Sequence, residues 1–329
     1  MPAMADGTVL VTGGAGYIGS HTVQALRRSG RSVVVLDSLE YGHAEAVGDA
    51  PLVVADIADE AVVADTCREH EVTQVVHFAA YKAVGESMEQ PTRYWHNNVA
   101  NTVRLIDATT SAGADQIVFS SSCSVYGTPS SVPVDESAPI APESVYAETK
   151  ATVERILSWY ATTDGVRSVS LRYFNAAGAS FDGSIGEDWT VALNLVPLVM
   201  KSMIVGEPRL TVYGTDYDTP DGTCIRDYIH VEDLAEAHVK ALDALAAGTI
   251  PDRAAALNVG TGTGSSVREV IDAAQRMTGR EVPHELGPRR PGDPTTTFAD
   301  PSRAQTVLGW QPRHGLDEII RTAYAWHSQ

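Results

Sequence analysis

Short runs of β-branched residues alternate with helical stretches through the first half of this 329-residue chain. The alternation predicts βαβ units, whose strands run the same way and form a parallel sheet with helices on both faces. We therefore expect an α/β fold with a doubly wound parallel sheet of the Rossmann type. The expected strands are 9–12, 32–36, 52–54, 74–78, 117–120 and 168–171, and the expected helices start near 17 or lie within 60–70, 94–111 and 146–160.

The chain changes character after Asn175. Gly- and Pro-rich stretches surround shorter elements there, and long irregular loops in a compact protein usually serve function. A helical segment at 231–246 and an apolar strand at 256–260 are typical of elements that return to the main sheet. We expect a first domain at 1–175, with returning segments near 228–260, and a smaller α/β substrate-binding domain mainly at 176–329.

Charge and cysteine content narrow the classes of partner and location. The formal net charge is -18, and an acidic surface repels nucleic acid and anionic membranes, so we expect neither as a partner. The three cysteines are widely separated and favour no disulfide framework, which fits a reducing compartment. The first residues do not resemble a signal peptide, and no apolar run approaches the about 20 residues that span a bilayer, so we expect a cytoplasmic protein.

A glycine-rich segment, V-L-V-T-G-G-A-G-Y-I-G, joins the first expected strand to the first helix. Gly13, Gly16 and Gly19 let the backbone turn tightly and approach a pyrophosphate at the positive end of the helix dipole. Asp37 ends the strand S-V-V-V-L-D about 20 residues later, where a carboxylate accepts hydrogen bonds from both ribose hydroxyls of NAD. Because the same carboxylate repels the extra phosphate of NADP, the segment predicts NAD as the cofactor.

The segment S-V-Y-A-E-T-K places Tyr146 and Lys150 four residues apart, so the two side chains share a helix face. A free tyrosine has a pKa of about 10, and a nearby ammonium favours the phenolate that a base at neutral pH requires. Ser122, after the strand 117–120, supplies a hydroxyl that relays a proton or holds a substrate hydroxyl. Beside a hydride acceptor, the three residues predict a catalytic acid–base triad.

Several motifs resemble a known family. G-G-A-G-Y-I-G, S-S-S-C-S-V-Y-G and Y-A-E-T-K are similar to the extended short-chain dehydrogenase/reductases. A narrower similarity to the UDP-glucose 4-epimerase family covers nearly the whole chain and rests on H-F-A-A-Y-K-A-V-G-E-S, Y-W-H-N-N-V, L-R-Y-F-N-A-A-G-A, D-G-T-C-I-R-D-Y-I-H-V-E-D-L, L-N-V-G-T-G and R-R-P-G-D. The resemblance implies an isomerase that interconverts UDP-glucose and UDP-galactose by transient oxidation at sugar C4, with NAD retained.

The resemblance also implies which residues bind the cofactor. Asp56 would lie at the adenine, although its position after the third strand fits a turn or helix cap equally well. Lys82 lies just past the strand 74–78, where cofactors bind in such sheets. The implied cofactor set is Gly13, Gly16, Tyr17, Ile18, Gly19, Asp37, Ser38, Asp56, Ile57, Phe78, Ala79, Ala80, Lys82, Asn97, Ser122, Tyr146, Lys150 and Phe174.

For the UDP-sugar, the resemblance implies a second set of residues. Arg226 and Arg290 would pair with the diphosphate, because guanidinium forks suit phosphate oxygens. Tyr213 would stack on uracil, and Asp293 would bind the uridine ribose. The small Thr297 replaces a tyrosine common in relatives restricted to unacetylated sugars, which implies room for UDP-N-acetylglucosamine and UDP-N-acetylgalactosamine. The implied set is Lys82, Ser122, Tyr146, Asn175, Asn194, Leu195, Tyr213, Arg226, Arg290, Asp293 and Thr297.

Other functions remain open on the same fold. A different NAD-dependent nucleotide-sugar 4-epimerase would share every motif, whereas a 4,6-dehydratase would carry Thr-Asp-Glu where this chain has Ser122, Cys123 and Ser124. A non-catalytic NAD-binding sensor would have no need of a matched base. The intact triad therefore favours the epimerase.

The resemblance implies a homodimer, but the sequence does not determine which surface forms the dimer interface. The apolar positions of the helices within 94–111 and 146–160 fit pairing across a two-fold axis as well as packing on the chain's own sheet. No metal-ligand spacing accompanies the ten histidines, so we expect no metal, and His230 fits a structural role.

Overall fold

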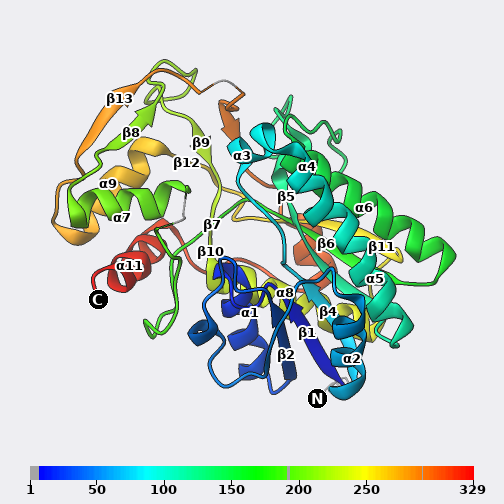
Figure 1. Cartoon of the computed structure of the whole chain (residues 1–329). Helices are drawn as coiled ribbons and strands as arrows, with labels where there is room; N and C mark the ends of the chain where they lie inside the picture. The colour runs from blue at the N-terminus through cyan, green and yellow to red at the C-terminus, as the bar shows by residue number, and fades with distance from the viewer. Residues whose placement is uncertain (1–6, 191–192, 291) are drawn as a thin grey trace.

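Seven parallel strands form the central sheet of the computed structural model, which describes residues 7–190, 193–290 and 292–329 (Figure 1). The strand order is β11-β6-β5-β4-β1-β2-β3, and every neighbouring pair is parallel. The order reverses between β1 and β4, and ligands bind at such switch points. The predicted doubly wound sheet is confirmed. Its strands are β1 (Thr8–Thr12), β2 (Ser32–Asp37), β3 (Leu52–Val54), β4 (Val72–His77), β5 (Gln116–Ser122), β6 (Arg167–Tyr173) and β11 (Ala254–Val259).

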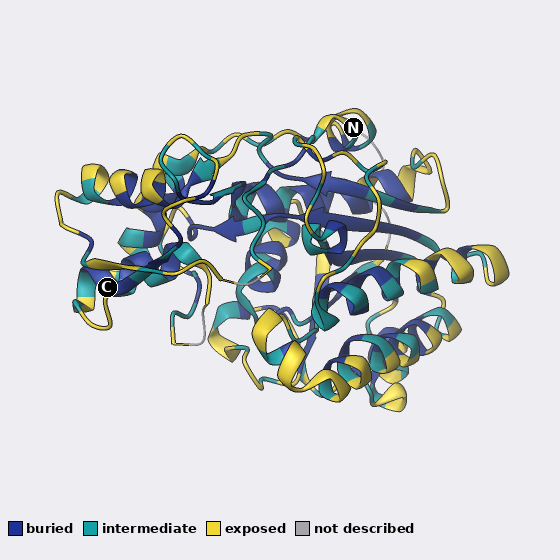
Figure 2. Cartoon of the chain, turned by 90° about the horizontal axis from the view of Figure 1, so that it is seen from above, coloured by how far each residue is buried: buried dark blue, intermediate teal, exposed yellow. Residues whose placement is uncertain are grey.

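Helices cover both faces of the sheet. One face packs against α1 (Tyr17–Arg28), α8 (Val231–Ala247) and α10 (Ser302–Leu308), and the other against α2 (Glu60–Glu69), α5 (Asn101–Ser111) and α6 (Val145–Thr163). Figure 2 shows the buried strands between these layers. Both α8 and β11 come from the second half of the chain, and β11 pairs with β6 at the edge of the main sheet.

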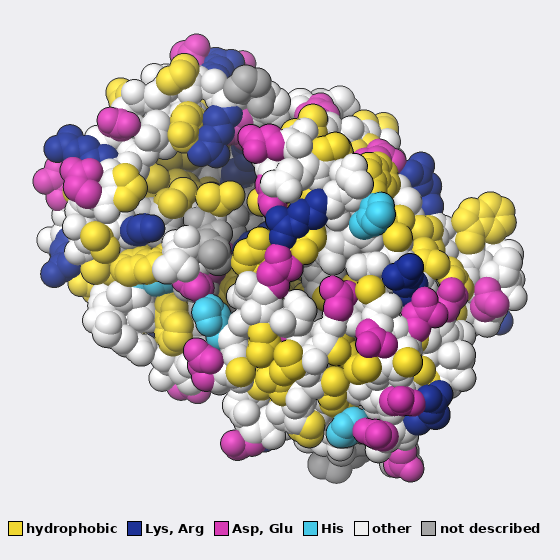
Figure 3. Space-filling view, in the orientation of Figure 1, with side chains coloured by type: hydrophobic (Ala, Val, Ile, Leu, Met, Phe, Trp, Pro, Cys, Tyr) yellow, Lys and Arg dark blue, Asp and Glu magenta, His cyan; other side chains and the backbone are white. Residues whose placement is uncertain are grey.

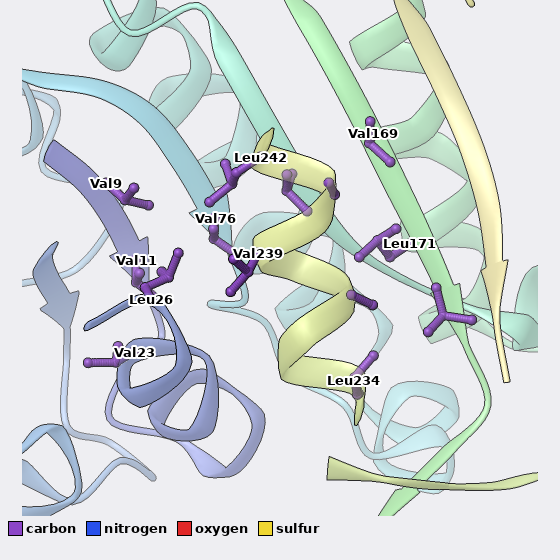
Figure 4. Close-up of a cluster of buried hydrophobic side chains, with 14 of the residues drawn as sticks. Val9, Val11, Val23, Leu26, Val76, Val169, Leu171, Leu234, Val239 and Leu242 are labelled. Atoms are coloured by element: carbon purple, nitrogen blue, oxygen red, sulfur yellow. The ribbon is translucent and has the colours of Figure 1, made fainter. Parts of the chain in front are cut away.

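Branched aliphatic side chains build the core between the sheet and its first helical layer. Alternate β-branched residues of the strands pack with α1 and α8 in one buried cluster, part of which Figure 4 shows, while the others belong to the cluster on the opposite face. Burial of such side chains removes apolar surface from water and fixes the strand register. The labelled members are Val9, Val11, Val23, Leu26, Val76, Val169, Leu171, Leu234, Val239 and Leu242.

A smaller lobe with its own buried cluster lies beside the sheet, at the upper left of Figure 1. Its helices and strands join segments that are distant in sequence, and β8 pairs with β13 while β9 pairs with β12 and β14. The strand β7 (Asn175–Ala177) pairs in parallel with β10 (Tyr228–His230) outside the main sheet. The lobe contains α7 (Leu195–Val205), α9 (Val267–Thr278), α11 (Leu316–His327), β8 (Leu210–Tyr213), β9 (Ile225–Arg226), β12 (Ser265–Ser266), β13 (His284–Gly287) and β14 (Thr296–Thr297).

The single helix expected within 94–111 is interrupted. The chain forms α4 (Pro91–Tyr94), then a π-helical segment, Trp95–Ala100, and then α5. Asn98 in this wide turn accepts a hydrogen bond from the Tyr81 amide at 2.9 Å and donates to the Tyr81 carbonyl at 3.0 Å and to the Thr149 hydroxyl at 3.2 Å. The π turn thus joins the loop after β4 to α6, and such turns are frequent at functional sites.

Short helical turns complete the chain, namely α3 (Val84–Glu89), Ala44–Val47 and Cys123–Tyr126. None of the helices in the described ranges combines the length and apolar character needed to cross a membrane. The same ranges hold no group of three or more His, Cys, Asp and Glu side chains placed to bind a metal ion. All three cysteines are free thiols.

Candidate active site

The glycine-rich loop joins β1 to α1 at the carboxyl edge of the sheet. Gly13 has a φ of 70°, and a Cβ built there would stand 2.6 Å from the backbone nitrogen of Ala79, just after β4. Gly16, which has no side chain, is the N-cap of α1. The loop therefore lies flat against the switch point and leaves the helix N-terminus open, as a pyrophosphate site requires.

Asp37 is fixed at the end of β2 by the backbone of this loop. Its carboxylate accepts hydrogen bonds at 2.9 Å from the amides of Ala15 and Leu39. The Asp37 carboxylate thus lies beside the glycine loop, where it would bind the ribose hydroxyls of a dinucleotide. Together the loop, the helix N-terminus and this carboxylate fit NAD.

The remaining residues predicted for the cofactor are distributed along the same edge. Asp56 is exposed and accepts a hydrogen bond from the Ala58 amide at 2.8 Å, which is the turn role that the sequence left open. Asn97 lies in the π-helical segment and donates to Asn98 at 3.1 Å. Phe78, Ala79 and Ala80 follow β4, Phe174 follows β6, Tyr17 and Ile18 open α1, and Ser38 and Ile57 follow β2 and β3.

Helix α6 carries the predicted base. Ser144 caps its N-terminus by accepting a hydrogen bond from the Ala147 amide at 3.2 Å. Lys150 is buried, and its Nζ atom donates to the Ser120 carbonyl at 2.7 Å and lies 5.8 Å from the centre of the Tyr146 ring. Ser122 is the last residue of β5, and its hydroxyl accepts a hydrogen bond from the Ser124 hydroxyl at 2.9 Å.

The phenol pKa differs from the expectation that the lysine would lower it. Burial raises the pKa of Tyr146 to about 12, and a hydrogen bond with Ser122 opposes that rise only in part. Burial also lowers the pKa of Lys150 to about 7, against the charge of Glu154. Loss of solvation disfavours both charged forms, and at 5.8 Å the ammonium does not offset that loss. Burial therefore favours the neutral forms of both the Tyr146 phenol and the Lys150 amine.

A buried ion pair holds α6 against the sheet. Arg172 of β6 donates to Glu154 of α6 from Nε at 2.9 Å and from a terminal nitrogen at 2.5 Å. Ser121 of β5 donates to the same carboxylate at 2.5 Å, and Arg172 also donates to the Tyr126 hydroxyl at 2.9 Å. Glu154 lies one turn beyond Lys150, so this network fixes the helix that carries the base.

The residues predicted for the UDP-sugar lie mainly in the smaller lobe. Arg226 and Asp293 form an ion pair with each other, and the Arg290 guanidinium stacks 3.8 Å above the centre of the Tyr213 ring. Thr297 on β14 stands opposite Arg226 on β9. Figure 3 shows Lys and Arg side chains along the hollow between the lobes. The structure thus brings these residues together in pairs that a ligand would have to rearrange.

Three of the remaining predicted residues lie on or beside β7 and α7. Asn175 donates to the Asp227 carbonyl at 3.0 Å. Asn194 is the N-cap of α7, of which Leu195 is the first residue.

Sequence reasoning missed Glu187, at which two predicted ligand-binding residues converge. Lys82 donates to its Oε1 atom at 3.2 Å, and Asn194 donates to the same atom at 3.4 Å. The only sequence signal was an acid in the segment I-G-E-D, after the Gly-rich loop. Ser87 was also missed, although it ends the quoted motif A-V-G-E-S, and its hydroxyl accepts a hydrogen bond from the Tyr146 amide at 3.1 Å.

His230 has the structural role that the sequence favoured. It is buried and caps α8 by accepting a hydrogen bond from the Glu232 amide at 3.1 Å. Burial lowers its pKa to about 3. The ring is therefore neutral at physiological pH, as a cap that accepts a hydrogen bond must be.

Comparisons with known proteins identify the family of the chain. Residues 9–260 match the model of the NAD dependent epimerase/dehydratase family. The UDP-glucose 4-epimerase of Lactobacillus helveticus is 45% identical over 321 residues, which cover 97% of this chain and 96% of the relative.

Two solved structures share the whole fold. The UDP-glucose-4-epimerase of Stenotrophomonas maltophila, with bound NAD and formylated UDP-arabinopyranose, has a TM-score of 0.94 at 42% identity and 98% coverage of both chains. The UDP-Glc/GlcNAc 4-epimerase of Campylobacter jejuni has a TM-score of 0.84 at 36% identity, with 98% of this chain and 99% of that chain covered. The chain belongs to the NAD dependent epimerase/dehydratase family.

Proposed function

We propose that this chain interconverts UDP-glucose and UDP-galactose with bound NAD as its cofactor. The observation that carries the proposal is the position of Ser122, Tyr146 and Lys150 at the carboxyl edge of the sheet, close to the switch point where the glycine loop and Asp37 form a dinucleotide site. Full-length similarity to UDP-glucose 4-epimerases supports the same activity.

The two ligands would divide the molecule between them. Residues 1–175, with the segments near 228–260, bind NAD through the cofactor residues named above, and residues 176–329 mainly bind the UDP-sugar. Arg226 and Arg290 bind the diphosphate, while Tyr213 and Asp293 bind the uridine. Without ligand, these four side chains contact one another in two pairs. On binding, contacts with the UDP group would replace these contacts, and the diphosphate would pair with the arginine charges.

Tyr146 acts on the proton of the sugar 4-hydroxyl. The chemistry that NAD supplies when bound is the reversible two-electron oxidation of sugar C4. Tyr146 accepts the hydroxyl proton as C4 is oxidised and returns it when C4 is reduced on its opposite face. Ser122 accepts a hydrogen bond from Ser124, so its own proton is free to bind the tyrosine or the sugar oxygen. When the Lys150 amine is protonated, its positive charge stabilises the Tyr146 phenolate.

The main alternative within the fold is a 4,6-dehydratase. Elimination of water across C5 and C6 needs an acid–base pair beside the sugar. The turn after β5 carries Cys123 and Ser124 at the positions where that family has carboxylates, and the Ser124 hydroxyl donates to Ser122. This turn favours epimerisation.

The variant Tyr146→Phe tests the role of the tyrosine. Removing one hydroxyl removes the proton acceptor but no packing volume, so we expect UDP-galactose conversion to fall roughly 10²–10⁴-fold, with unchanged circular dichroism and NAD content. Tyr160→Phe is the matched control, because Tyr160 lies on the same helix and donates to Asp107 at 2.5 Å. A Tyr146→Phe enzyme within a few-fold of wild type, assayed by coupled UDP-glucose formation, would show that another group is the base.

We also propose that the enzyme accepts the N-acetylated sugars. Thr297 is buried, and its hydroxyl has no hydrogen-bond partner among the residues that the structure describes. The residue is small and stands next to Arg226 in the strand pairing, where a tyrosine ring would fill space beside the sugar. The similarity to a UDP-Glc/GlcNAc 4-epimerase supports this wider substrate range.

Thr297→Tyr tests this substrate range. We expect wild type to interconvert both sugar pairs, and the variant to keep UDP-galactose activity while its kcat/KM for UDP-N-acetylgalactosamine falls at least about tenfold, as a steric clash of 1–3 kcal/mol gives. Thr296→Tyr serves as a control for adding a ring to the same strand. The absence of N-acetyl turnover in wild type would contradict the substrate range without affecting the epimerase assignment.

We further propose that two copies pair through α5 and α6. Trp159 on α6 is 69% exposed, and Tyr160 ties α6 to Asp107 of α5, so the two helices present one surface. An exposed indole on a helix face is typical of a protein interface. By sedimentation we expect twice the chain mass for wild type and a shift toward single chains for Trp159→Glu. A wild-type protein that sediments as single chains at micromolar concentration would exclude this dimer.

A further inference from the structure

A buried carboxylate lies where the two proposed ligand sites meet. Glu187 is 5% exposed, and its Oε1 atom accepts hydrogen bonds from Lys82 at 3.2 Å and from Asn194 at 3.4 Å. The first partner, Lys82, belongs to both the implied cofactor set and the implied UDP-sugar set, whereas Asn194 belongs to the UDP-sugar set alone. Burial, followed by the charge of Glu187, raises the pKa of Tyr17 at the start of α1. Glu187 therefore lies close to both ligand sites.

Electrostatics alone would disfavour an acid at this place. Two diphosphates bring several negative charges, and a buried carboxylate repels them at short range. Burial raises the pKa of Glu187, while Lys82 and Asn194 oppose that rise by stabilising the charged form. The contacts with Lys82 and Asn194 therefore favour the ionised form of Glu187 and act against the effect of burial.

The backbone around Glu187 is held in place from the opposite side. The Trp326 indole of α11 donates to the Glu187 carbonyl at 3.1 Å. A Cβ built on Gly186 would lie 2.5 Å from the same indole, so the chain packs directly on the ring. A carboxylate on such a fixed backbone can orient flexible partners, and the Lys82 side chain, 59% exposed, is such a partner.

We propose that Glu187 is a positioning residue that orients Lys82 toward the cofactor and Asn194 toward the UDP-sugar. The inference rests on the proposed function for the identity of the two ligands. Among the residues that the structure describes, Glu187 is the charged partner of Lys82, and without it the long side chain gains rotamer freedom that binding must remove. Asn194 needs only an acceptor, which a neutral amide also supplies.

Two variants distinguish the contact of Glu187 with Lys82 from its contact with Asn194. Glu187→Gln keeps an acceptor for Asn194 and removes the charge that holds Lys82, so we expect the dissociation constant of NAD to rise about fivefold and that of UDP to stay within about twofold. Glu187→Ala removes both contacts, so we expect the dissociation constants of NAD and UDP to rise about fivefold or more. NAD is measured by equilibrium dialysis and UDP by calorimetry. Asp188→Asn is the matched control, because the neighbouring acid pairs with His43 at 3.0 Å instead.

Three results would overturn the proposal. Tighter NAD binding by Glu187→Gln would mean that the acid acts only by repulsion. Equal weakening of UDP binding in the Gln and Ala variants, accompanied by a lower Tm, would indicate a structural role. In the Lys82→Met background Glu187→Gln should lose its effect on NAD, and full persistence there would exclude positioning through Lys82. Neither binding constant requires turnover, so a wild type without epimerase activity would refute the proposed function while these constants still decide the role of Glu187.

Discussion

The buried amine of Lys150 is the constraint on which the rest of the site depends. The residue is 3% exposed, and the loss of solvation lowers its pKa to about 7. A lysine in such a place weakens the fold and is retained where its charge serves chemistry. Its amine donates a hydrogen bond to the Ser120 carbonyl near the end of β5 and lies 5.8 Å from the centre of the Tyr146 ring. The charge of a bound cofactor and substrate would act on this pair, in which burial favours the neutral form of both groups.

Helix α6 must therefore be fixed more firmly than its own packing alone would achieve. Arg172 and Glu154 join it to β6, and Asn98 joins it through Thr149 to the π turn. Ser87 accepts the amide of Tyr146 itself. These contacts come from three different parts of the chain and converge within three turns of one helix. Catalytic geometry of this kind requires positions held to a fraction of an ångström, which polar networks on rigid elements supply.

The sequence was most informative where local chemistry decides the structure. The β-branched runs predicted the strands, the glycine spacing predicted the loop at Gly13, and the i, i+4 spacing predicted that Tyr146 and Lys150 share a face. Glu187 and Asn98 escaped because their roles exist only in three dimensions: each contacts residues more than five positions away that no periodicity links. The π turn was missed for the same reason, since its residue Asn98 contacts Tyr81, which lies 17 positions earlier in the sequence. The upward shift of the phenol pKa was not predicted, because the sequence analysis considered the nearby charge without the desolvation that burial causes.

A spectrum tests most directly whether Ser122, Tyr146 and Lys150 act on a sugar whose C4 is oxidised while NAD stays bound. The purified protein is supplied with NAD, freed of excess cofactor, and its near-ultraviolet absorbance is recorded before and after addition of UDP-galactose under anaerobic conditions. We expect the absorbance of reduced nicotinamide to appear on the protein, and to be far weaker in Tyr146→Phe. An unchanged spectrum in wild-type protein that calorimetry shows to be saturated with UDP-galactose would contradict the mechanism.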